Sequence, residues 1–179
     1  LFLFAFASVA HAASGGSITF DGDNDYINIG DTSNIYDASE TKITVAHWFR
    51  HTNTSGSDRS LSFRRTSGTG QNIFVNRNSS GAFDLGYRNG ANSFTILEGT
   101  VQVFSDDIWH YGAYTINGAN AALFMDGVAD GTASDVDSGN TFEGGSQTVI
   151  GQTSASSASD EWMGQLAYIS VYPGSVLSI

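Results

Sequence analysis

The sequence predicts an all-β protein, a single antiparallel β-sandwich. Three observations point to this class. Apolar and polar residues alternate at a period of two after residue 16, clusters of Gly, Asn, Asp and Ser interrupt the alternation at short intervals, and no segment has the pattern of a long helix. The 21 Gly and single Pro agree with short strands joined by tight turns. At 179 residues the chain can fill one core, and a second core is not expected.

The alternation places the strands in a definite order along the chain. We expect them at Ser17 to Phe20, Tyr26 to Ile29, Lys42 to His51, Ser60 to Arg65, Asn72 to Asn76, Phe83 to Tyr87, Phe94 to Leu97, Trp109 to Ile116, Ala121 to Met125, Gln147 to Ile150 and Gln165 to Tyr172. The strand from Lys42 has bulky residues on both faces, which is typical of a strand inside a sandwich. We also expect Trp48 and Trp109 to be largely buried.

Two dipeptides predict hairpin turns between neighbouring strands. Asn117-Gly118 and Asp126-Gly127 both tolerate the positive φ that two-residue turns require. The segment Ala121 to Met125 lies between them and should therefore pair with its neighbours on both sides.

Charge and cysteine content exclude several function classes. The net charge of −11, from 18 acidic and 7 basic residues, disfavours nucleic acid and anionic membrane surfaces as partners. The chain has no Cys, which excludes disulfides, thiol catalysis and thiolate metal sites.

The first residues resemble an export signal. Leu1 to Ala10 is an uncharged apolar run, and Ala10-His11-Ala12 has the small-x-small form of a cleavage site. We therefore divide the chain into a signal-peptide-like segment, residues 1–13, and a β-sandwich domain, residues 14–179, and expect a secreted or extracellular protein. The run is too short for a transmembrane helix. If it is retained instead, we expect it to be covered by another subunit. The chain is expected to be truncated at both ends.

Four blocks of sequence resemble one family. They are FDG at 20–22 with DYI at 25–27 and IG at 29–30, ITVAHWFR at 43–50, WHYGAYT at 109–115 with LFMDG at 123–127, and WMGQLAYISVY at 162–172. In this order they resemble the laminin-G-like modules of the concanavalin A-like lectin and glucanase superfamily, across nearly all of residues 17–179. The resemblance implies a concanavalin-like jelly roll. It says less about function, because this fold carries binders, adhesins, enzyme appendages and virion parts.

Asp21, Asp23 and Asp25 are the candidate metal ligands. They mimic the start of an EF-hand loop, but Tyr26 and Thr32 occupy the positions that need Gly and Glu. Without a metal, the three carboxylates would accept hydrogen bonds from local amides in a turn. The resemblance suggests a structural calcium, although Ala167 and Tyr168 replace the acidic pair that relatives carry in the last strand.

No catalytic constellation is evident in the sequence. The four Glu residues lie beside turn-like residues and no paired-carboxylate run occurs, so we expect no glycosidase chemistry and no enzyme. There is no Gly-x-Ser-x-Gly elbow. His110 is interpreted as a packed or hydrogen-bonded histidine, and His47 as a residue of the concave face or of an interface.

Exposed aromatic and amide residues are the candidate ligand-binding groups, because sugar rings stack on flat side chains with polar neighbours. They are Tyr87, Arg88, Asn89 and Asn92 at a predicted turn, and Trp162 after a Ser-rich loop. The alternative is that they are ordinary rim residues.

The sequence leaves three functions in order of preference. The leading one is an exported, non-catalytic, lectin-like module that binds a glycan or another cell-surface ligand in adhesion. The second is a structural subunit of an extracellular filament, sheath or virion, which self-assembles through the retained N-terminal segment and the His47 face. The third is a glycan-active enzyme.

Overall fold

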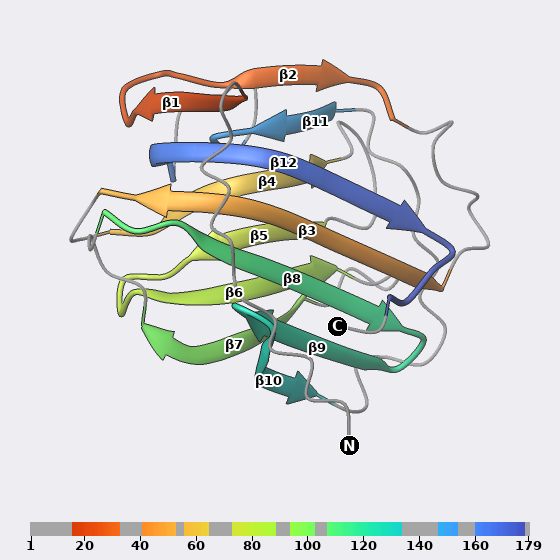
Figure 1. Cartoon of the computed structure of the whole chain (residues 1–179). Helices are drawn as coiled ribbons and strands as arrows, with labels where there is room; N and C mark the ends of the chain where they lie inside the picture. Colours follow the sequence, from red (N-terminus) through yellow and green to blue (C-terminus); the bar gives the residue numbers. More distant parts are fainter. Residues whose placement is uncertain are drawn as a thin grey trace.

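The computed structural model is a sandwich of two antiparallel sheets, as predicted. It describes residues 16–32, 41–52, 56–64, 73–88, 94–102, 107–133, 147–153 and 160–177. Each sheet contains six strands, and these ranges contain no helix. Consequently no helix in the described ranges could span a membrane. Figure 1 shows the two layers, with β12, β3 and β8 crossing in front of β4, β5 and β6.

The two sheets are built from strands that are far apart in sequence. The first sheet has the order β1 (Ser17–Asp21), β12 (Met163–Pro173), β3 (Lys42–His51), β8 (His110–Asn117), β9 (Asn120–Met125) and β10 (Val128–Ala133). The second has the order β2 (Ile27–Gly30), β11 (Gln147–Ile150), β4 (Asp58–Arg64), β5 (Ile73–Arg77), β6 (Ala82–Arg88) and β7 (Phe94–Gln102).

Each strand expected from the sequence is present with bounds within two residues, except that β7 runs five residues beyond Leu97, and the structure adds β10. Its sequence, VADGTA, has Asp and Gly at its centre, which looks like a turn. In the structure the register shifts between Ala129 and Gly131, so Asp130 occupies a β-bulge. Both predicted hairpins are confirmed, with one turn at Asp126-Gly127 and the other one residue later than expected, at Gly118-Ala119.

Aromatic rings from both sheets form the centre of the core. Phe49 of β3 lies 4.3 Å from Phe83 of β6, measured between ring centroids. The ring centroid of Trp162 lies 6.0 Å from that of Phe49, which it meets edge-on, and 6.1 Å from that of Phe83, to which it is tilted. These contacts join the sheets, because β3 belongs to one layer and β6 to the other.

The tryptophan at the centre of the core is not one of the two predicted from the sequence. Trp162 is fully buried, whereas Trp48 and Trp109 are only partly buried. Trp48 lies on the face of β3 opposite the core residue Phe49, and its ring packs against Tyr111 at 5.3 Å. When large side chains occupy both faces of a strand, the sequence alone does not show which face packs against the core.

A buried ion cluster also links the sheets. Asp58 Oδ2 of β4 lies 2.7 Å from His51 Nε2 of β3 and accepts a hydrogen bond from Arg77 Nη1 of β5 at 2.9 Å. Arg77 Nη1 also donates to the carbonyl of Gly56 at 3.0 Å. All three side chains are buried, and burial lowers the pKa of Arg77 while the Asp58 carboxylate opposes that shift.

Asp130 closes one edge of the sandwich. Its Oδ1 accepts hydrogen bonds from the backbone amides of Thr100 and Val101, at 2.8 and 2.7 Å, and from Thr100 Oγ1 at 2.9 Å. Because Asp130 is on β10 and Thr100 on β7, the bulge in β10 ties the edge strands of the two sheets together.

Trp162→Ala should destabilise the protein by about 3 to 5 kcal/mol, because it removes a large, fully buried aromatic side chain and leaves a cavity. Chemical denaturation followed by fluorescence or circular dichroism gives the free energy of unfolding. Trp48→Ala is the matched control and should cost clearly less, since Trp48 is partly exposed. Equal losses in the two variants would contradict this account of the core.

Candidate binding site

Three polar side chains form a row across β5, β6 and β7. The register places Asn76 opposite Asp84, and Asp84 opposite Glu98. Their neighbours Val75 and Leu85 belong to the core. Because successive side chains of a strand point to opposite faces, the row lies on the face of the second sheet that is turned away from the core, which we call the outer face. We call Asn76, Asp84 and Glu98 the polar row.

Asp84 is the buried centre of the polar row. It is 4% exposed, whereas Glu98 is exposed. Burial, reinforced by the negative charge of Glu98, raises the pKa of Asp84 to about 6. Hydrogen bonds from the side chains of Asn78 and Asn76 oppose this shift, and Asn78 Nδ2 donates to Asp84 Oδ1 at 2.9 Å.

Side-chain amides hold Asp84 in place and leave one acceptor unused. Asn78 is fixed by its own turn, since its Oδ1 accepts from the amides of Ser80 and Ala82, at 2.9 and 3.2 Å. Asn76 is 7% exposed and its Oδ1 has no hydrogen-bond partner. A buried acceptor without a partner is costly, and this one lies below the surface beside Asp84.

A stack of three residues lies beside the polar row on the outer face. The Phe74 ring packs across Gly86, where a Cβ atom would come within 2.0 Å of the ring. The guanidinium of Arg59 lies 4.0 Å above the same ring, and Arg59 Nη2 lies 3.2 Å from Asp160 Oδ2. The Phe74 ring is therefore covered, and its face is not free to stack on a sugar.

The structure describes only some of the candidate binding residues predicted from the sequence. Tyr87 and Arg88 lie in β6, the strand that carries Asp84, opposite Thr95 and Phe94. Asn89 and Asn92 fall outside the described residues. A role for these four residues stays a prediction.

The expected exposure of Trp162 was wrong. Its side chain is fully buried, and its ring meets that of His51 edge-on at 4.8 Å. The Ser-rich segment before it suggested a solvated position, but the backbone amide of Trp162 donates to the carbonyl of Gly151 and directs the residue into the core. Trp162 has no surface on which a ligand could stack.

Asp21, Asp23 and Asp25 form a turn held by its own hydrogen bonds. The amide of Asp23 donates to Asp21 Oδ1 at 2.9 Å, and the amide of Asp21 donates to Asp25 Oδ2 at 3.0 Å. Within the described ranges, no group of three or more His, Asp or Glu side chains is arranged to hold a metal ion. Calcium at this turn stays a prediction from the resemblance.

The two histidines singled out in the sequence, His110 and His47, have different environments. His110 Nδ1 lies 2.8 Å from Asp126 Oδ2, which agrees with the hydrogen-bonded histidine that was predicted. His47 is 1% exposed and lies between the sheets, stacked on Tyr114 at 5.7 Å. The interpretation of His47 as part of a concave face or an interface was therefore wrong. Burial lowers its pKa to about 3.

Sequence reasoning missed the polar row because its members are separated along the chain. Glu98 was interpreted only as a residue near a turn, and Asp84 was not singled out. One signal was present: Asp84 interrupts the apolar strand around Phe83 and Leu85, although on a half-buried strand such a residue is ordinary. Only the pairing of β5, β6 and β7 brings Asn76 and Glu98 beside it.

The family is settled by comparison of the whole sequence. The profile of the laminin-G-like group described as the concanavalin A-like lectin/glucanases superfamily matches residues 21–178. The chain belongs to this superfamily. Its two-sheet architecture is the jelly roll expected of a member. No curated protein matches the sequence significantly.

Solved structures of similar fold come from several kinds of protein. The carbohydrate-binding module CBM40 of the Ruminococcus gnavus IT-sialidase has a TM-score of 0.71 at 15% identity, covering 92% of each chain, and has also been solved bound to α2,3 sialyllactose. The heptameric SAP-like pentraxin of Limulus polyphemus has a TM-score of 0.65 at 16% identity, over 87% of this chain and 74% of that one.

A third similar structure is domains LG4-5 of the mouse laminin α1 chain, with a TM-score of 0.71 at 13% identity. It covers 88% of this chain, which spans only 42% of the laminin structure. At these identities the likenesses concern the fold alone.

His47→Phe should weaken the loss of stability in acid. Unfolded His47 binds a proton near pH 6.5 and the folded side chain only near pH 3, so the unfolded state binds more protons between these values. The stability contributed by neutral His47 is thus present above pH 6.5 and lost as the pH falls toward 3.

The difference in unfolding free energy between pH 7 and pH 4 should therefore be smaller in His47→Phe by up to about 3 kcal/mol. Denaturant titrations at both pH values measure it. His110→Asn serves as a control at a partly exposed histidine. An unchanged pH dependence in His47→Phe would show that His47 is not buried in a neutral form.

Proposed function

We propose that this chain is an exported, non-catalytic binding domain that binds a neutral carbohydrate on the outer face of its second sheet. The observation that carries the proposal is the polar row, in which the exposed Glu98 carboxylate lies opposite the buried, amide-held Asp84. Carboxylate and amide oxygens accept hydrogen bonds, and sugar hydroxyls donate them.

The charge of the row favours a neutral ligand. Glu98 is exposed at the surface, and its charge already contributes to the raised pKa of Asp84. A ligand carboxylate placed here would be repelled. Although a carbohydrate-binding module of similar fold has been solved with sialyllactose, we expect this chain to prefer glycans without sialic acid.

The surroundings of Asp84 support binding rather than catalysis. Glycoside hydrolysis needs one carboxyl group to donate a proton to the scissile bond and a second to act on the other side. Asp84 has a suitably raised pKa and a second carboxylate opposite, but its oxygens are engaged by the amides of Asn76 and Asn78. Such bonds hold the buried carboxylate in a fixed position.

Export is supported by the apolar run at residues 1–10 and by the membership of the family. A secreted or surface location would bring the domain into contact with extracellular glycans. We infer no nucleic-acid partner, because the net charge is −11.

A glycan array comparing neutral with sialylated oligosaccharides tests the proposal, followed by calorimetric titration of the best neutral ligand. Glu98→Gln should weaken binding about tenfold, because a charge-assisted hydrogen bond contributes about 1.5 kcal/mol or more. Asp107→Asn is the charge-matched control. Asp107 pairs with Arg50 of β3 in the first sheet, so this variant should bind like the parent protein.

Three outcomes would contradict the proposal. They are no binding to any neutral glycan, preference for sialylated glycans, and release of reducing sugar from the bound glycan. The last result would identify an enzyme instead of a binding domain.

A further inference from the structure

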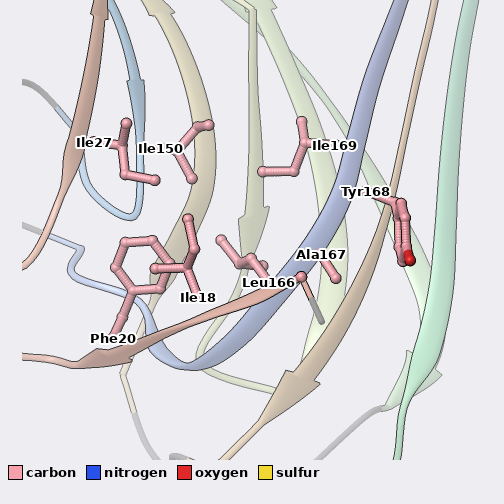
Figure 2. Close-up of a pocket in the computed structure, with 9 residues that line it drawn as sticks. Ile18, Phe20, Ile27, Ile150, Leu166, Ala167, Tyr168 and Ile169 are labelled. Atoms are coloured by element: carbon pink, nitrogen blue, oxygen red, sulfur yellow. The ribbon is translucent and has the colours of Figure 1, made fainter. Parts of the chain in front are cut away.

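A second surface lies at the opposite edge of the sandwich, where β1 and β2 are the outermost strands. An apolar pocket of about 180 Å³ opens between the two sheets there. Figure 2 shows the apolar side chains around it, which come from β1, β2, β11 and β12. Those that define its walls are Ile18, Phe20, Ile27, Ile150, Leu166 and Ile169.

The size of the pocket matches one large apolar side chain. A dry cavity of about 150 Å³ lined by Leu, Ile and Phe is large enough to bind benzene. A pocket of about 180 Å³ with the same kind of lining can therefore take a single phenyl ring or a leucine side chain.

Two exposed apolar residues lie at this pocket. Ile18 is 50% exposed and Tyr168 is 61% exposed. Tyr168 has φ of +49°, in the left-handed region, at a β-bulge of β12 between Ala167 and Ser170. A bulky residue rarely adopts this conformation, and the bulge interrupts the alternation of β12 so that Tyr168 is exposed between the buried Ala167 and the partly buried Ile169.

The backbone of β1 is available beside the pocket. Among the described strands β1 pairs only with β12, so its other edge carries backbone amide and carbonyl groups without a neighbouring strand. An extended peptide can add to such an edge, with main-chain hydrogen bonds supplying affinity and a side-chain pocket supplying specificity.

Negative charge gathers at the Asp21 end of this edge. Asp21 and Asp23 are exposed, and Glu161 accepts a hydrogen bond from the amide of Asn24 at 2.7 Å, which places its carboxylate at the same turn. Asp25 completes the group. No cation forms an ion pair with these four carboxylates within the described part of the chain. Basic side chains of a partner would meet uncompensated charge here.

We propose that the β1 edge binds an extended segment of a partner protein that inserts one Phe or Leu side chain into the pocket and places basic residues against Asp21 and Asp23. The segment pairs antiparallel with β1, because antiparallel pairing is the more stable arrangement. Its basic residues then precede the apolar anchor. Asp21 lies three positions after Ile18, about 10 Å along a strand, so the basic residues of the partner lie two to four positions before the apolar anchor.

The probe is the acetylated, amidated peptide Lys-Lys-Ser-Val-Phe-Val-Thr with a fluorescent label, titrated with the purified protein by anisotropy. Saturable binding is expected. Replacing the Phe of the probe by Ala, or both Lys by Glu, should weaken binding at least tenfold, and the peptide of reversed sequence should also bind less tightly.

Matched variants of the protein locate the site. Ile18→Asp should weaken binding of the probe at least tenfold, whereas Ile29→Asp, at a residue of β2 that is 51% exposed, should leave it unchanged. Circular dichroism and the melting temperature show that both variants fold. Binding of the neutral glycan should be unaffected by Ile18→Asp, so failure of one proposal can be distinguished from failure of the other.

The proposal is overturned if the probe does not bind, if its Phe→Ala form binds equally well, or if Ile18→Asp has no effect. It is also overturned if the protein forms a dimer in sedimentation analysis that Ile18→Asp dissociates, because the edge would then pair with a second copy of this chain.

Discussion

A buried pairing of Asp58 with Arg77 and His51 links the two sheets of the sandwich. It is the one described ion cluster that reaches across the interior, with His51 on the first sheet and its two partners on the second. Removing one member of a buried pair leaves an uncompensated charge and costs about 3 to 5 kcal/mol. The Trp162 ring packs against the His51 ring, so the ion cluster adjoins the aromatic centre of the core.

The two edges of the sandwich differ, since one is closed by Asp130 and the other has a pocket, and the candidate surfaces lie near different edges. At the β7 and β10 edge, Asp130 ties the sheets together with hydrogen bonds to Thr100 and Val101. At the β1 and β2 edge the gap is lined by apolar side chains and forms a pocket. The polar row lies near the β7 and β10 edge, where Asp130 joins the two sheets. Strands held in one register keep binding groups in place, as a preorganised binding surface requires.

The sequence predicted the fold class well because the period of two and the turn dipeptides are local signals. It failed where tertiary contacts override local appearance. No strand was predicted where β10 lies, because its bulge at Asp130 interrupts the alternation, and Trp162 followed a polar segment but fills the core. The polar row could not be predicted, since Asn76, Asp84 and Glu98 become neighbours only through strand pairing. Of the predicted site residues, Tyr87 and Arg88 share the strand of Asp84.

We propose that ligands bind on the outer face beside Asp84. The most direct measurement is a two-dimensional NMR titration of isotopically labelled protein with a neutral oligosaccharide, following backbone amides and the side-chain amides of Asn76 and Asn78. The account predicts that the largest shifts fall on these side chains and on the backbone of β6 and β7 around Asp84 and Glu98. Shifts confined to the β1 edge, or to the turn at Asp21, would contradict it.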